Sequence, residues 1–198
     1  MDHQFQLNIA DTALLLIDLQ EKLLPKILDS ESIVLNAEFM VKVSKALNIP
    51  VFATEQYPKG LGPTVEILRT HLVSISEKRT FSAVRDGEVL GALKSDARIK
   101  VIIIGIEAHI CVLQTVIDLL NQGFHLFVCV DAVSSRYAID VEIALQRMQQ
   151  AGAILTTVEA CAYEMLETAD HSAFKEVSKL VQERMRQLGP DGKALSNK

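Results

Sequence analysis

The sequence has few of the features that identify nucleic-acid-binding or membrane proteins. Lysine and arginine together number 20 against 25 aspartates and glutamates, which gives a formal net charge of -5, and no basic run suits a phosphate backbone. A basic segment followed by a long apolar stretch is also missing, so we expect no signal peptide and no membrane span. These absences predict a cytoplasmic protein that binds neither nucleic acid nor membranes.

Cysteine is scarce as well. An odd count of three in 198 residues indicates free thiols in a reducing compartment rather than a disulfide framework. Hydrophobic residues make up 49% of the chain and charged residues 23%, enough for a sizeable core. The length favours a single domain spanning 1–198, with a core of about residues 10–187 and with residues 1–9 and the tail from Gly189 loosely attached.

Short apolar runs alternate with helical patterns along the chain. This alternation predicts an α/β fold in which a parallel, Rossmann-like sheet carries helices on both faces. The six strands are expected at 12–17, 51–54, 72–76, 101–104, 124–130 and 152–156. Helices are expected at 30–47, 86–94, after Cys111, at 137–150 and at 170–187, and a loop at 55–63. Neither G-x-G-x-x-G nor a Walker-type loop is present, so a nucleotide-binding role has no support.

Cys111 lies where the buried strand at 101–104 gives way to a helix. Unpaired backbone N–H groups and the helix dipole converge on such a position, and both favour the thiolate, which is the nucleophilic form. The alternative is that Cys111 simply packs in the core. Cys129, inside a strand, and Cys161, beyond the last strand, fit that alternative well.

Two further polar residues follow predicted strands, on the side where ligands bind in parallel sheets. Asp18 follows the first strand, and a carboxylate there could take the thiol proton as a base. Lys78 follows the third strand and could stabilise both thiolate and carboxylate. Asp18 could instead cap a helix or turn, and Lys78 could be solvated surface. His109 is a competing base, although a role in the pocket wall or turn is favoured.

Taken together, these segments resemble the isochorismatase-like superfamily of cysteine hydrolases, and most specifically its branch of isochorismatase domain-containing proteins. The segments that carry the resemblance lie at 13–20, 54–62, 77–83, 105–112 and 131–136. It implies a three-layer α/β/α fold with a six-stranded parallel sheet, and a triad of Asp18 as base, Lys78 as orienting cation and Cys111 as nucleophile. It also implies a cis peptide bond between Ile106 and Glu107, with the Glu107 and Cys111 backbone N–H groups as an oxyanion hole.

The chain departs from this resemblance in ways that bear on its chemistry. The metal-binding Asp-x-His motif of the nicotinamidase branch has no counterpart in Glu55-Gln-Tyr-Pro58, so we expect no metal and no cofactor. Vinyl ether cleavage by true isochorismatases needs no cysteine nucleophile, so Cys111 favours amide-type chemistry.

We therefore expect a metal-independent cysteine hydrolase of a small molecule, working through an acyl-enzyme and assembled as a homo-oligomer. Gln56, Phe81 and His109 are the predicted pocket residues, although Phe81 could be a core aromatic and Gln56 an ordinary loop residue. The competing hypothesis is a catalytically silent scaffold or regulatory protein that keeps the fold.

Overall fold

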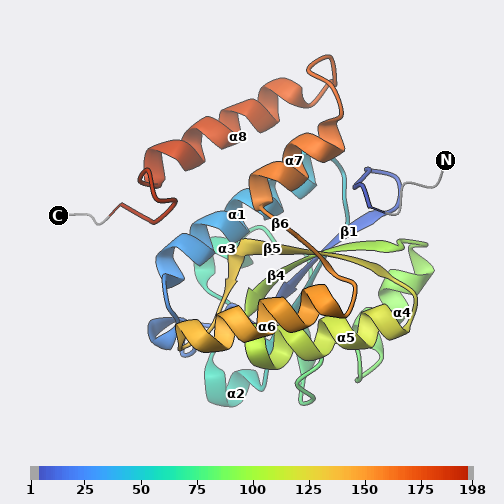
Figure 1. Cartoon of the computed structure of the whole chain (residues 1–198), viewed down its shortest axis with the longest axis vertical. Coiled ribbons are helices and arrows are strands. Elements are labelled where there is room, and N and C mark those ends of the chain that lie inside the picture. Colours follow the sequence, from blue (N-terminus) through green and yellow to red (C-terminus); the bar gives the residue numbers. More distant parts are fainter. Residues whose placement is uncertain (1–4, 196–198) are drawn as a thin grey trace.

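Residues 5–195 are described by a computed structural model, and they form a six-stranded parallel sheet with helices on both faces (Figure 1). The strand order is β3-β2-β1-β4-β5-β6. The strands are β1 (Thr12–Ile17), β2 (Val51–Gln56), β3 (Ser76–Lys78), β4 (Lys100–Ile106), β5 (His125–Ser134) and β6 (Ile154–Thr156). The predicted fold class, a three-layer α/β/α arrangement, is confirmed.

The helices divide between the two faces, with α1, α7 and α8 on one and α4, α5 and α6 on the other (Figure 1). The longer helices are α1 (Ser30–Ala46), α4 (Glu88–Ser95), α5 (Leu113–Asn121), α6 (Ala138–Gln150), α7 (Val158–Leu166) and α8 (Phe174–Gln187). The shorter ones are η1 (Leu24–Lys26), α2 (Pro58–Leu61), α3 (Glu66–Arg69) and the π-helical turn η2 (Ala108–Val112). None of the helices among these residues is both long and apolar enough to span a membrane.

The central strands explain the continuous apolar runs of the sequence. Every residue of β1 and β4 is buried, as expected for parallel strands covered on both faces. Successive side chains of β1 enter opposite cores: Leu14 and Leu16 pack towards α1, while Leu15 and Ile17 pack towards α5. Asp18, which directly follows β1, is therefore buried between the two apolar layers.

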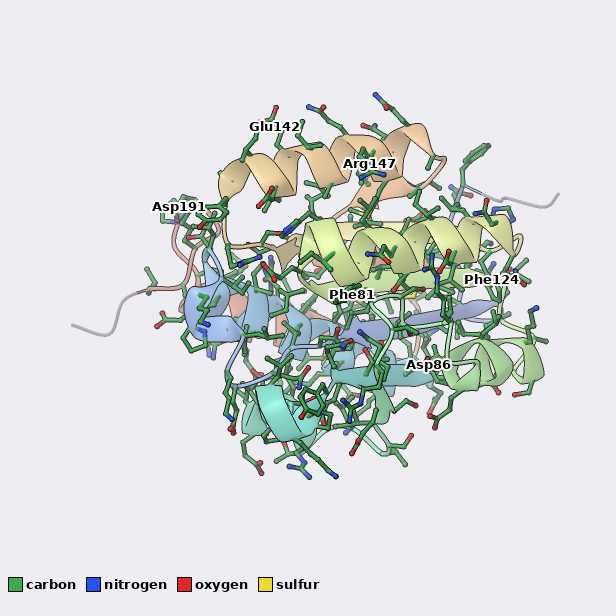
Figure 2. All side chains as sticks on the ribbon, turned by 90° about the horizontal axis from the view of Figure 1, so that it is seen from below. Phe81, Asp86, Phe124, Glu142, Arg147 and Asp191 are labelled. Carbon is green, nitrogen blue, oxygen red and sulfur yellow. The ribbon has the colours of Figure 1, made fainter. Side chains whose placement is uncertain are left out.

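Helix α6 shows the same division on its own surface. Ala144 and Met148 are buried against the sheet, whereas Glu142 and Arg147 project outwards (Figure 2). This is the 3.6-residue periodicity from which the helix was predicted.

Several predicted boundaries were wrong. The third strand is Ser76–Lys78 rather than 72–76, because a polar segment pairs with β2 while the more apolar residues before it do not. The fifth strand continues past 130 to Ser134. The segment 55–63, predicted as a loop, contains the end of β2 and the short helix α2. The last helix begins at Phe174 rather than at 170, and α7 was not predicted.

The two ends of the described chain are better attached than predicted. Leu7 is 2% exposed and belongs to the apolar core on the α1 side of the sheet, and its backbone N–H donates to Glu164 of α7. Near the C-terminus, Ser32 Oγ accepts a hydrogen bond from the Ala194 backbone N–H at 2.8 Å, and Lys193 Nζ lies 3.1 Å from Asp29 Oδ1. The parts of the predicted loose ends at 1–4 and 196–198 lie outside the described residues.

Candidate active site

Sheet order brings three predicted residues to one end of the sheet. In the register of β1 with β4, Ile17 faces Gly105, so Asp18 immediately follows a strand beside the one that leads to Cys111. The third residue, Lys78, ends the edge strand β3, where it pairs with Gln56 of β2. Its long side chain spans the width of β2 to reach the carboxylate.

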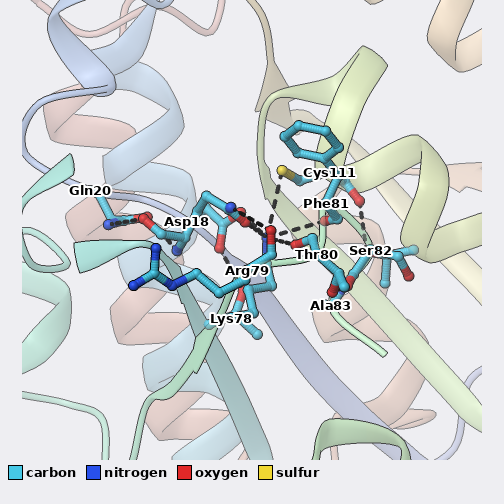
Figure 3. A network of polar contacts seen from close by, with 12 residues as sticks. Asp18, Gln20, Lys78, Arg79, Thr80, Phe81, Ser82, Ala83 and Cys111 are labelled. Atoms are coloured by element: carbon cyan, nitrogen blue, oxygen red, sulfur yellow. Dashed lines mark hydrogen bonds and ion pairs between the residues drawn. The ribbon is translucent and has the colours of Figure 1, made fainter. Parts of the chain in front are cut away.

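Asp18, Lys78 and Cys111 form one buried cluster (Figure 3). Lys78 Nζ lies 2.7 Å from Asp18 Oδ2 and 3.6 Å from Cys111 Sγ. The three residues are 0%, 4% and 7% exposed. The Lys78–Asp18 contact is an ion pair whose angles differ from those of a hydrogen bond, so Oδ2 accepts no aligned hydrogen bond from residues 5–195. An acceptor position on this carboxylate therefore remains open.

The Lys78 ammonium group is fixed by further contacts. It donates to Gln56 Oε1 at 2.7 Å and to the backbone oxygens of Phe81 and Thr80 at 3.1 and 3.3 Å. An ammonium group has three donors, and these contacts hold it between the carboxylate and the sulfur.

Asp18 is held just as firmly. Its backbone has φ 53°, an uncommon conformation for a residue other than glycine, and its N–H donates to Thr54 O at 3.1 Å. Thr54 Oγ1 donates to Asp18 Oδ1 at 2.8 Å. Burial raises the pKa of Asp18 above its ordinary value, while the positive charge of Lys78 and the hydrogen bond from Thr54 oppose that rise. The carboxylate is thus a stronger base than an exposed aspartate.

The prediction that the helix terminus lowers the thiol pKa is wrong. Burial, followed by the negative charge of Asp18, raises the pKa of Cys111 to about 12, and Lys78 only partly compensates. In addition, Cys111 lies within the π-helical turn η2 rather than at the start of an ordinary helix. The resting cysteine is therefore a neutral thiol, which needs a neighbouring base to become a nucleophile.

The predicted cis peptide bond between Ile106 and Glu107 is present. The Glu107 N–H finds no acceptor among residues 5–195, whereas the Glu107 carboxylate pairs with Arg136 Nε at 2.9 Å. The Glu107 side chain thus pairs with a residue outside the triad, and the Glu107 backbone N–H, next to the turn that carries Cys111, is free to donate a hydrogen bond. The oxyanion hole stays a prediction.

The three predicted pocket residues have different surroundings. Gln56 contacts Lys78 directly. Phe81 is 54% exposed, so it is no core aromatic, and it lies on the face seen in Figure 2. The ring nitrogens of His109 contact Ser135 Oγ at 2.9 Å and Asp140 Oδ2 at 3.7 Å rather than the Cys111 sulfur. This geometry disfavours His109 as the base, and its place in the pocket wall stays a prediction.

Two residues that hold the site together were missed by sequence reasoning. Gln20 donates to Gly62 O at 2.6 Å and to Gln56 O at 3.1 Å. Thr115 Oγ1 donates to Cys111 O at 2.6 Å and accepts from the Ala83 N–H at 2.8 Å. Gln20 could have been noticed as a polar residue two positions after Asp18. Thr115 had no comparable signal, because one threonine in an apolar helix is common.

Among the described residues, no three histidine, cysteine, aspartate or glutamate side chains come together as a ligand set.

The fold and this end of the sheet correspond to a known class of protein. The model of the Isochorismatase domain family matches residues 12–160, and the chain belongs to that family, within the isochorismatase-like hydrolase superfamily. The resemblance inferred from the sequence segments is confirmed.

Individual relatives indicate which branch of the family the chain resembles most. The chain is 40% identical over 180 residues to isochorismatase domain-containing protein 2 of Rattus norvegicus, covering 89% of this chain and 83% of the relative. Among solved structures, MAR1 ribonuclease from Caenorhabditis elegans has 43% identity and a TM-score of 0.86, covering 89% and 92% of the two chains. The YcaC gene product of Escherichia coli, an octameric hydrolase of unknown specificity, has 25% identity and a TM-score of 0.86, covering 94% and 92%.

Proposed function

We propose that the protein is a metal-independent cysteine hydrolase that cleaves the C–N bond of a small amide. The observation that carries the proposal is the position of Lys78 Nζ, 2.7 Å from Asp18 Oδ2 and 3.6 Å from Cys111 Sγ in a buried cluster. Base, cation and thiol are the parts that acyl transfer to cysteine requires. Family membership supports the coarser statement that the protein is a hydrolase.

The mechanism follows from the pKa directions. Asp18 accepts the Cys111 proton as the sulfur attacks the amide carbon, and Lys78 stabilises the negative charge that develops on the sulfur while the proton leaves; once the S–C bond has formed, that charge lies on the former carbonyl oxygen. The Glu107 and Cys111 backbone N–H groups stabilise the oxyanion of the tetrahedral intermediate. Protonated Asp18 gives its proton to the leaving amine, which departs and leaves a thioester. Asp18 next activates water, which releases the acid and restores the thiol.

The pocket, the domain organisation and the assembly complete the proposed function. Gln56, Phe81 and His109 form the substrate pocket, and residues 1–198 act as one hydrolase domain without a cofactor. We propose a homo-oligomer, supported by the octameric Escherichia coli relative. Light scattering tests the assembly, and a monomer at working concentration would contradict it.

A panel of small amides and nitriles, assayed with wild type and Cys111→Ala, tests the reaction. We expect at least one amide to be hydrolysed, and the alanine variant to lose activity by a factor of about 10³ or more. Cys161→Ala, which changes a buried cysteine of α7, is the matched control and should keep its turnover. Hydrolysis that survives in Cys111→Ala would remove the mechanism.

The panel also separates the alternatives. A scaffold protein would turn over no compound, and its Cys111 reactivity would not depend on Asp18. Because one relative is named as a ribonuclease, a single-stranded RNA belongs in the panel. Cleavage of RNA without amide turnover would replace the proposal.

A further inference from the structure

Arg79 is an exposed residue held at three points. Its backbone N–H donates to Asp86 Oδ2 at 3.1 Å, and its backbone oxygen accepts from Gln56 Nε2 at 3.0 Å. Its guanidinium carbon lies 4.0 Å from the centroid of the Tyr57 ring. An exposed arginine ordinarily keeps much rotamer freedom, so this one has already lost part of the entropy that ligand binding would otherwise cost.

The Tyr57 ring is itself held in place. Tyr57 has φ 39°, which is a genuine outlier for a bulky residue, and its N–H donates to Lys78 O at 3.0 Å. The ring packs against Gly60 so closely that a Cβ there would lie 2.6 Å from Tyr57 Cε1. A strained tyrosine and a glycine thus form a platform beside the triad lysine.

The guanidinium donors are unused. No N–H of the Arg79 side chain donates to any residue among 5–195, and no carboxylate there pairs with it. In contrast, Arg136 is paired with Glu107 and Arg85 with Asp118. A second cation lies nearby, because Lys22 Nζ donates to Gly60 O at 3.1 Å. Two cations therefore lie at this rim of the site, and although the carboxylates of Asp86 and Glu21 lie close to it, neither pairs with the guanidinium group of Arg79, whose planar set of donors is free.

We propose that Arg79 binds a carboxylate at the far end of the substrate and so selects anionic amides. A guanidinium binds a carboxylate with two parallel hydrogen bonds. Figure 3 shows the Arg79 side chain extending from Lys78 towards Gln20, away from the Cys111 sulfur. A substrate whose amide lies on Cys111 must cross Gln56 to reach it, which requires a chain of several atoms. Mono-amides of short dicarboxylic acids have this chemistry.

The inference rests on the proposed function and is tested by steady-state kinetics. The mono-amide of adipic acid is compared with hexanamide, which has the same chain length and no charge. For Arg79→Gln we expect KM for the anionic amide to rise about tenfold with kcat unchanged, and KM for hexanamide to stay the same. Arg147→Gln, which removes an exposed arginine of α6, is the control. An unchanged KM for the anionic amide would overturn the inference.

A second measurement keeps the inference separate from the hydrolysis mechanism. The same two amides are used to protect Cys111 from iodoacetamide, a readout that needs no turnover. The adipic mono-amide should protect wild type at about tenfold lower concentration than hexanamide, and Arg79→Gln and Tyr57→Ala should abolish the difference, while Tyr57→Phe keeps it. Protection without turnover would contradict the proposed amide hydrolysis but would still support the carboxylate site at Arg79. Equal protection by both amides in wild type, or stronger protection by a short RNA, would overturn the carboxylate site.

Discussion

At the scale of single residues, the chemistry of the site depends on which of two buried groups, the Asp18 carboxyl or the Cys111 thiol, holds a proton. Burial raises the pKa of both Asp18 and Cys111; the Asp18 charge raises the Cys111 pKa further, whereas a hydrogen bond from Cys111 opposes the rise in the Asp18 pKa. The stable arrangement pairs Lys78 with the Asp18 carboxylate and leaves the thiol neutral. Nucleophilicity therefore arises by transfer of a proton inside the cluster, not from a resting thiolate.

The Thr54 hydroxyl gives the first prediction at this scale. Thr54→Val removes the 2.8 Å hydrogen bond that lowers the Asp18 pKa, so that pKa rises. Because Asp18 must be ionised, activity is lost as pH falls through its pKa. A bond of about 1 kcal/mol moves the acid limb of the kcat/KM profile upwards by about 0.7 pH unit. Thr64→Val is the control, since its buried hydroxyl has no partner among residues 5–195. An unmoved acid limb in Thr54→Val would contradict the role of Asp18.

At the scale of elements, the β4 backbone leaves no room for a side chain against β1 at the point where the two strands lead into the site. Gly105 has φ 127°, and a Cβ there would lie 2.1 Å from Ile17 O and 2.7 Å from Ile17 N. No side chain fits between the strands at this position. The glycine that ended the apolar run in the sequence therefore sets the spacing between Asp18 and the turn that carries Cys111.

Gly105→Ala should unfold the protein or destabilise it by more than about 3 kcal/mol, because both the contact and the backbone conformation are unfavourable. Urea denaturation followed by circular dichroism measures this. The matched control is Gly91→Ala in α4, where an added Cβ meets nothing within 4 Å. That variant should gain about 0.5–1 kcal/mol. Similar stability in both variants would show that β4 can accept a side chain at position 105 against β1, and would contradict this requirement for glycine.

At this scale the sequence predicted much of the fold and part of the site. The continuous burial of β1 and β4 made those strands readable, and the polar β3 was misplaced because it buries little. Asp18, Lys78 and Cys111 could be proposed singly, but the strand order that brings them together depends on packing across the sheet. The direction of the Cys111 pKa shift was mispredicted because the sequence shows that a helix follows the strand but does not show how deeply the thiol is buried. Burial is the larger effect.

At the scale of the whole molecule, Arg184 joins α8 to three other parts. It donates to Asn36 Oδ1 at 2.7 Å and to Glu159 Oε2 at 2.9 Å, and its Nη2 lies 3.3 Å from Asp131 Oδ2. Burial raises the pKa of Asp131, and Arg184 opposes that rise. The outermost helix (Figure 1) is thus fastened to α1, β5 and α7 by one side chain.

Arg184→Ala should lower the free energy of unfolding by about 2–3 kcal/mol, because it leaves Asp131 without its cation and Asn36 without a donor. Arg186→Ala, which removes an exposed arginine from the same helix, should change stability by less than about 0.5 kcal/mol. Thermal unfolding of the two variants makes the comparison. Equal stability would mean that apolar packing alone holds α8.

The pH dependence of Cys111 alkylation by iodoacetamide tests the central claim most directly. In wild type, Asp18 supplies the base, so the rate should fall only below the raised Asp18 pKa and stay level through neutral pH. In Asp18→Asn the thiol must lose its proton to water, so the rate should rise about tenfold per pH unit up to the thiol pKa. Mass spectrometry separates Cys111 from Cys129 and Cys161. If the wild-type rate also rises about tenfold per unit through neutral pH, in parallel with Asp18→Asn, Asp18 is not the base and the account is wrong.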